Sequence, residues 1–187
     1  MSSSRTTISF NYDRSVEQYL SHALSNYYRI GLERAQKIVA SLEILHPYGT
    51  VGKLPWQRTE RGVPYGGEGD ASELLYVTSQ LRTFTEQIED KSLIESMRAA
   101  LAESDCVVFL GFAFHEINMK LLEFGAPHRE RWIYGTAHGI SSEDCEVITG
   151  DIARRLCSKP QYVSIRQVKC TELFDQFRFT LSRFVTG

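Results

Sequence analysis

Short segments that resemble buried strands alternate with segments of helical period, and this alternation most constrains the fold. The strand-like segments are residues 6–10, 44–45, 106–110, 132–134 and 162–165. Such an order is typical of a mostly parallel sheet with helices on both faces. The sequence therefore predicts an α/β fold of Rossmann-like type. Residues 106–110 form a continuous apolar run, which predicts a central and nearly fully buried strand.

Helical spacing of apolar residues predicts helices between these strands. The expected helices include residues 31–42, 70–81, 92–103 and 171–184. A further short helix is expected between the predicted strands 106–110 and 132–134. Apolar residues at such spacing predict the face that a helix buries. The predicted stripes are Val16, Tyr19, Leu20, Ala23 and Leu24 near the N-terminus, Val147, Ile148, Ile152 and Leu156 further on, and Leu173, Phe174, Phe177, Leu181 and Phe184 at the end.

The length of 187 residues fits one domain. Residues 50–70 are rich in glycine and proline and show no sustained period, which is typical of a long irregular connection. We therefore expect a single domain over residues 1–187, with an irregular and helical insertion at about 50–104.

Composition excludes several classes of protein. Charged residues make up 24% of the chain, with 21 Lys and Arg against 23 Asp and Glu, which argues against disorder and against a uniformly basic nucleic-acid binder. The longest apolar run, residues 106–114, is about half of the roughly 20 residues that a transmembrane helix needs. The first residues lack the apolar stretch of a signal peptide. We expect a cytoplasmic protein without membrane or nucleic-acid partners.

Polar residues and a glycine turn follow three of the predicted strands. Asn11 and Asp13 follow the first, His46 the second, and Gly111 the third. In an open parallel sheet the carboxyl ends of the strands form the ligand crevice, so these groups are expected to converge there. Judged singly, each has a more ordinary interpretation that we favour: Asp13 as a helix cap, Asn11 in an Asx-turn and His46 as a loop histidine.

Three strings, ISFNYDRSVE, ILHPYG and VVFLGFAFHEINM, occur in this order at strand ends. Together they resemble the SIR2-like (sirtuin-related) proteins of prokaryotes, over about residues 6–165. The resemblance implies the SIR2/DHS-like version of the Rossmann-like fold and NAD as ligand or substrate. It also implies a place among the NAD-hydrolysing proteins of antiphage defence.

The resemblance assigns roles residue by residue. It implies that Asn11 and Asp13 contact nicotinamide and its ribose, and that His46 acts as the catalytic base. It further implies cofactor contacts from the turn after the third strand and from the next strand end, namely Gly111, Phe112, Gly135 and Thr136.

Departures from the family qualify the expected activity. The glycine-rich strand, turn and helix that bind the pyrophosphate in the family are expected before the first strand, where only MSSSR stands. The expected fold therefore lacks the first glycine-rich βαβ unit, and we expect the chain to be inactive alone and to associate with itself or with that unit. The four cysteines form no C-x-x-C pair, so no zinc or other metal is expected.

Three functions stay open at this point. The first is an NAD glycohydrolase-type activity in the complete form. The alternative is a non-catalytic nucleotide-binding, scaffold or regulatory module. The third is an α/β domain that uses its crevice for an unrelated small ligand.

Overall fold

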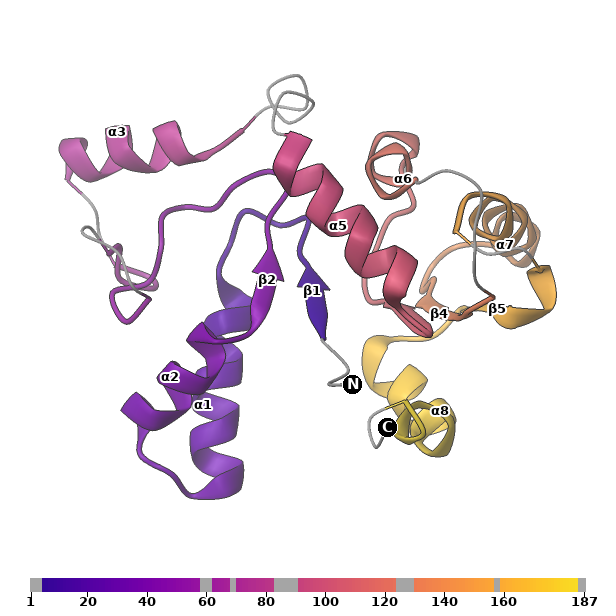
Figure 1. The fold of residues 1–187 in the computed structure, drawn as a ribbon, viewed down its shortest axis with the longest axis horizontal. Helices are drawn as coiled ribbons and strands as arrows, with labels where there is room; N and C mark the ends of the chain where they lie inside the picture. The colour runs from indigo at the N-terminus through magenta and orange to yellow at the C-terminus, as the bar shows by residue number, and fades with distance from the viewer. Residues whose placement is uncertain are drawn as a thin grey trace. The chain divides into compact units, whose positions relative to one another are not determined.

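Parallel strands form both sheets of the structure, which is a computed structural model (Figure 1). One sheet has two strands and the other has three, and all of their pairings are parallel. The structure describes residues 5–57, 62–67, 70–82, 91–123, 130–156 and 159–184. They belong to two compact units, Met1–Leu93 and Ile94–Gly187. The α/β class is thus confirmed, whereas a single domain over 1–187 stays a prediction.

The first unit contains one crossover between parallel strands. Strand β1 (Thr6–Ile8) pairs with β2 (Glu43–Leu45), with Thr6 opposite Glu43 and Ile8 opposite Leu45. Helices α1 (Ser15–Tyr28) and α2 (Leu32–Ala40) connect them and pack on each other (Figure 1). Helix α1 ends at Arg29, whose left-handed backbone lets the following Ile30 N–H bond the Ser25 carbonyl at 3.1 Å and stops the helix.

The buried face of α1 differs from the apolar stripe predicted for it. The fully buried side chains are Glu17 and Ser21, together with Arg14 just before the helix. Tyr19 was predicted to be buried but is 73% exposed. Ser21 bonds the Gln18 carbonyl within the helix, and Glu17 and Arg14 turn inward because they find partners outside it, as described below.

A loop region and helix α3 (Ala71–Gln80) follow β2. An antiparallel bridge joins Gly49 of the loop to Leu81, the residue after α3. Gly49 has a φ of 73°, and a Cβ atom there would lie 2.0 Å from the Gln80 carbonyl oxygen. Only glycine therefore fits at this bridge.

The second sheet has the strand order β3-β4-β5. Helix α5 (Lys91–Glu103) precedes β3 (Cys106–Phe109), α6 (Glu116–Leu122) leads to β4 (Trp132–Thr136), and α7 (Ser142–Leu156) leads through a 3-10 turn (Pro160–Tyr162) to β5 (Val163–Arg166). Helix α8 (Cys170–Ser182) follows. The guanidinium of Arg155 on α7 contacts the carboxylates of Glu116 and Glu123, which ties α7 to the α6 region.

Strand β4, rather than β3, is the central strand of this sheet. The prediction that residues 106–110 are central and nearly fully buried is therefore wrong in part, because β3 pairs on one side only among the described strands. Phe109 is buried, whereas Val107 and Val108 are half-buried. In β4, Ile133, Tyr134, Gly135 and Thr136 are all buried.

The predicted stripes of the later helices are also correct only in part. On α7, Ile152 and Leu156 are fully buried but Val147 is 70% exposed. On α8, Leu173 is buried but Phe174 is 46% exposed. Within the described residues, no helix combines the length and the apolar character needed to cross a bilayer.

Candidate functional site

The parallel pairing of β1 and β2 brings three predicted site residues to one edge of their sheet. Asn11 and Asp13 follow β1, and His46 follows β2 directly. The Nδ1 atom of His46 lies 3.2 Å from the backbone oxygen of Asn11. The carboxylate of Asp13 is close enough for its charge to act on the His46 ring. The convergence expected for the first two strand ends is therefore present in the structure.

Glu17 is a fourth member of this cluster, and the sequence interpretation missed it. Its Oε1 atom lies 3.0 Å from Nε2 of His46, and the side chains of His46 and Glu17 are only 9% and 4% exposed. The helical phase contained a signal for this position. Glu17, Ser21 and Leu24 are spaced four and three residues apart, so a helix that turns Leu24 inward also turns Glu17 inward.

Opposing influences act on the protonation of His46. Burial lowers the pKa of its imidazole, whereas the hydrogen bond and charge of Glu17, the Asn11 carbonyl and the charge of Asp13 raise it. The net shift of the His46 pKa is upward from 6.5. The cluster therefore favours the imidazolium form of the ring.

Asp13 and Asn11 hold their places in different ways. The Asp13 carboxylate accepts a hydrogen bond of 2.8 Å from the backbone N–H of Ser15, two residues later, as in an Asx-turn. The N-cap position of α1 is Arg14, which makes no side-chain capping bond. Hydrogen bonds from Ser15 are the main cause that lowers the pKa of Asp13, and the charge of His46 lowers it further. Asn11 contacts His46 through its backbone, and the residue itself is exposed.

Arg14 is buried beside this cluster and fixes a distant loop. Its Nη1 atom donates to the carbonyl of Val63 at 2.6 Å and its Nη2 atom to that of Pro64 at 3.3 Å, with the residue only 4% exposed. Burial lowers the pKa of Arg14, and the charge of Glu17 opposes that shift. The Nε atom of Arg14 and the Oε2 atom of Glu17 have no hydrogen-bond partner in the described structure.

In the second unit, the structure joins Gly111 and Thr136. They follow and end the adjacent parallel strands β3 and β4, and the Gly111 N–H donates to the Thr136 hydroxyl at 2.9 Å. Gly111 has a φ of 59°, a turn conformation that glycine adopts without strain. Phe112 packs its ring on Phe109 and Phe114. The placement of this group relative to Asn11, Asp13 and His46 in the other unit stays a prediction.

Gly135 has a packing reason to be glycine. A Cβ atom there would lie 2.7 Å from Cδ1 of Ile165 and 3.3 Å from Cβ of Phe109. The residue is buried in the middle of the central strand. The close approach of these neighbours therefore accounts for Gly135 without a ligand.

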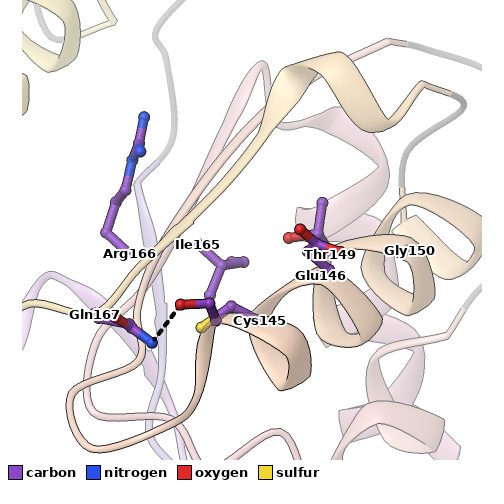
Figure 2. A pocket seen from close by; sticks show the side chains of 8 residues that line it. Cys145, Glu146, Thr149, Gly150, Ile165, Arg166 and Gln167 are labelled. Carbon is purple, nitrogen blue, oxygen red and sulfur yellow. Dashed lines mark hydrogen bonds between the residues drawn. The ribbon is translucent and has the colours of Figure 1, made fainter.

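A shallow pocket of about 450 Å³ lies between α7 and the carboxyl end of β5 (Figure 2). Its lining includes Cys145, Glu146 and Thr149 of α7 and Arg166 of β5. Arg166 pairs with Thr136 in the sheet, so the pocket is one strand away from the Gly111–Thr136 contact. None of the predicted site residues lines it. Arg166 stands at the carboxyl end of a predicted strand, where ligand sites of parallel sheets occur. The sequence interpretation did not use this signal.

Burial favours the protonated thiol form of two cysteines in the second unit, Cys106 and Cys145. Burial raises the pKa of Cys106 to about 11. Burial also raises the pKa of Cys145 in the pocket, and the neighbouring Asp144 adds to that shift. Among the described residues, no three His, Cys, Asp or Glu side chains are arranged to hold a metal ion. The expectation that the protein binds no zinc stays a prediction.

No family model, curated protein or solved structure matches this chain. The comparison with known proteins therefore leaves function to be argued from the sequence strings and from the geometry of the described residues.

Proposed function

We propose that this chain is a SIR2-like NAD-binding domain of Rossmann-like type, whose complete form hydrolyses NAD+ at the nicotinamide–ribose bond. The observation that carries the proposal is the meeting of Asn11, Asp13 and His46 at one edge of the β1–β2 sheet. These are the residues to which the family resemblance assigns the reacting end of NAD+. Their convergence supports that assignment, because an amide, a carboxylate and a base that act on one bond must lie close together.

The residues of this cluster suit the chemistry of that bond. The bond breaks with its electron pair leaving on nicotinamide, while a water oxygen forms the new bond to the ribose carbon and releases a proton. The exposed Asn11 side chain offers an amide that can hydrogen-bond the carboxamide of the leaving group. The Asp13 carboxylate offers negative charge where positive charge develops on the ribose. His46, in its neutral form, accepts the released proton.

The second unit carries the other residues to which the resemblance assigns cofactor contacts. We propose that the backbone of the Gly111–Phe112 turn and the hydroxyl of Thr136 contact a nucleotide, since both lie at the carboxyl ends of parallel strands. Gly135 would contribute by allowing close packing rather than by contacting the ligand.

One observation favours the alternative of a non-catalytic nucleotide-binding or scaffold module. Both ring nitrogens of His46 contact protein atoms, and the Asp13 carboxylate already accepts a bond from the Ser15 backbone. A cluster of this kind can serve stability alone. The two functions differ in whether the chain turns NAD+ over, which makes that turnover the deciding measurement.

The test is nicotinamide release from NAD+, measured by chromatography. It compares the 187-residue chain with a form extended at its N-terminus by a glycine-rich strand–turn–helix unit, which we expect to supply phosphate binding. We expect turnover by the extended form, reduced by about 100-fold or more in Asn11→Ala and in His46→Ala. His22→Ala, which removes an exposed histidine of α1, is the matched control and should retain turnover.

Two results would go against the proposal. An extended form without turnover, or one that is indifferent to both substitutions, supports the non-catalytic module. Turnover by the 187-residue chain alone would support the function but refute the need for the added unit.

A further inference from the structure

The His46 ring faces a hydrogen-bond acceptor at each of its nitrogen atoms. The partner of Nδ1 is the Asn11 backbone oxygen at 3.2 Å, and the partner of Nε2 is the Glu17 carboxylate at 3.0 Å. A carbonyl oxygen and a carboxylate can only accept, and a neutral imidazole carries one N–H. The arrangement is therefore fully bonded only when the ring is an imidazolium.

The two contacts of the ring differ in strength. The Glu17 carboxylate is 4% exposed, and a buried carboxylate needs a hydrogen-bonded partner, which the ring supplies through Nε2. The Asn11 carbonyl is a neutral acceptor, and its contact is 0.2 Å longer, from 3.2 and 3.0 Å. When the ring loses one proton, the bond to the charged partner is the one that it keeps. The neutral ring therefore keeps its proton on Nε2 and presents Nδ1 as the basic atom.

We propose that Glu17 is the positioning residue for His46: it holds the Nε2–H tautomer, so that Nδ1 is the nitrogen that exchanges protons with the substrate. This inference rests on the proposed function for its substrate, but the tautomer is a property of the chain itself. In the step concerned, the attacking water takes the place of the Asn11 carbonyl beside Nδ1, its proton moves to Nδ1, and the ring becomes an imidazolium. Once the water oxygen has bonded to the ribose carbon, the new Nδ1–H can turn back to the Asn11 carbonyl as its acceptor, and Glu17 provides the balancing charge.

The charged groups around the pair fix the direction of its pH dependence. Asp13, in the loop after β1, adds negative charge near the ring, and Glu17 on α1 adds more. Arg14, which precedes α1, is close enough to Glu17 for their charges to interact. Because the net effect favours the imidazolium, the basic form of His46 is populated only at higher pH, and turnover should rise with pH. Removing the Glu17 charge should move that rise to lower pH while reducing the maximal rate.

The first readout needs no activity. The 187-residue chain with isotope-labelled histidine is titrated by NMR as wild type, Glu17→Gln and Glu33→Gln. Glu33 is an exposed carboxylate that pairs with Lys37 on α2, so its substitution removes the same charge away from the ring. We expect Glu17→Gln to move the His46 titration to lower pH and to mix the two neutral tautomers. Glu33→Gln should leave the His46 signals where they are in wild type.

The second readout is the pH profile of NAD+ cleavage by the form that turns over. We expect Glu17→Gln to reduce kcat by about 10-fold or more, with a smaller effect on KM, and to move the acidic limb of the profile to lower pH. Glu17→Asp keeps the charge on a shorter side chain and should restore part of the rate and the wild-type limb. A purely structural role for Glu17 would move neither the limb nor the tautomer.

Each result decides the inference separately from the proposed function. A His46 titration and tautomer unchanged by Glu17→Gln would overturn it, whether or not NAD+ is cleaved. If no form cleaves NAD+, the proposed function fails, and the NMR titration alone decides whether Glu17 positions the ring. Circular dichroism checks that each variant is folded. If Glu17→Gln fails to fold, the titration of Glu17→Met, which also removes the charge, takes its place, and a His46 ring insensitive to that change counts against the inference.

Discussion

Replacing Gly135 by alanine tests whether this residue is there for packing. The added Cβ would lie 2.7 Å from Cδ1 of Ile165 and 3.3 Å from Cβ of Phe109. The Ile165 end can rotate away, but the Phe109 Cβ is fixed to the backbone of the paired strand β3. Overpacking of this kind costs about 1–3 kcal/mol, and the reduced freedom of the unfolded chain returns about 0.4–1 kcal/mol. We expect Gly135→Ala to lower the free energy of unfolding by about 1–2 kcal/mol.

The assay is urea denaturation of the full chain, with two further variants as controls. Gly150→Ala lies on α7 with open space around the new Cβ and should stabilise the protein by about 0.8–1 kcal/mol. Ile165→Val removes the Cδ1 atom that clashes, so the double variant with Gly135→Ala should lose less stability than the two single losses combined. If Gly135→Ala leaves the free energy of unfolding unchanged, or if the loss in the double variant equals the sum of the two single losses, the packing argument is refuted. A ligand contact would then again be the explanation for Gly135.

Two more predictions concern the first unit. Arg14→Met removes the two bonds to the Val63 and Pro64 carbonyls and leaves Glu17 buried without its neighbouring cation, so it should cost about 3 kcal/mol in urea denaturation. The exposed Arg34→Met should cost under about 0.5 kcal/mol, and equal losses in the two variants would contradict the role of Arg14. Because folding raises the pKa of His46 above 6.5, its stabilisation is fully present below that pH and is lost as pH rises through the folded-state pKa. The stability advantage of wild type over His46→Gln should therefore shrink as pH rises across this range, and an advantage that grows would show the sign to be wrong.

The strands and most helices could be predicted from local sequence. Each of the five described strands starts and ends within two residues of its prediction, as residues 6–10 against β1 (Thr6–Ile8) illustrate. Short apolar runs bounded by turn residues are a local signal, which explains this agreement. Strand order is not local. The apolar run of β3 gave no indication that β4 lies between β3 and β5.

The buried faces of helices were predicted less well, and α1 shows why. An apolar stripe through Tyr19 is the natural interpretation of that helix taken alone. The structure instead buries Glu17, because its partner is His46, which follows β2 and lies 29 residues later in the chain. A local sequence pattern cannot distinguish a buried charged residue that pairs with a distant residue from a charged residue on the surface. The same limit applies to Arg14, whose partners are loop carbonyls about 50 residues away.

The first turn of α1 has a consequence for how a chain like this can evolve. Arg14 and Glu17 depend on their angular position around the helix axis, and each added residue rotates the rest of the helix by about 100°. One inserted or deleted residue between Asp13 and Glu17 would turn the carboxylate away from His46 even if every side chain were preserved. Extra residues in a surface loop are tolerated far better. We therefore expect natural variants of this sequence to keep the number of residues between positions 13 and 17 unchanged.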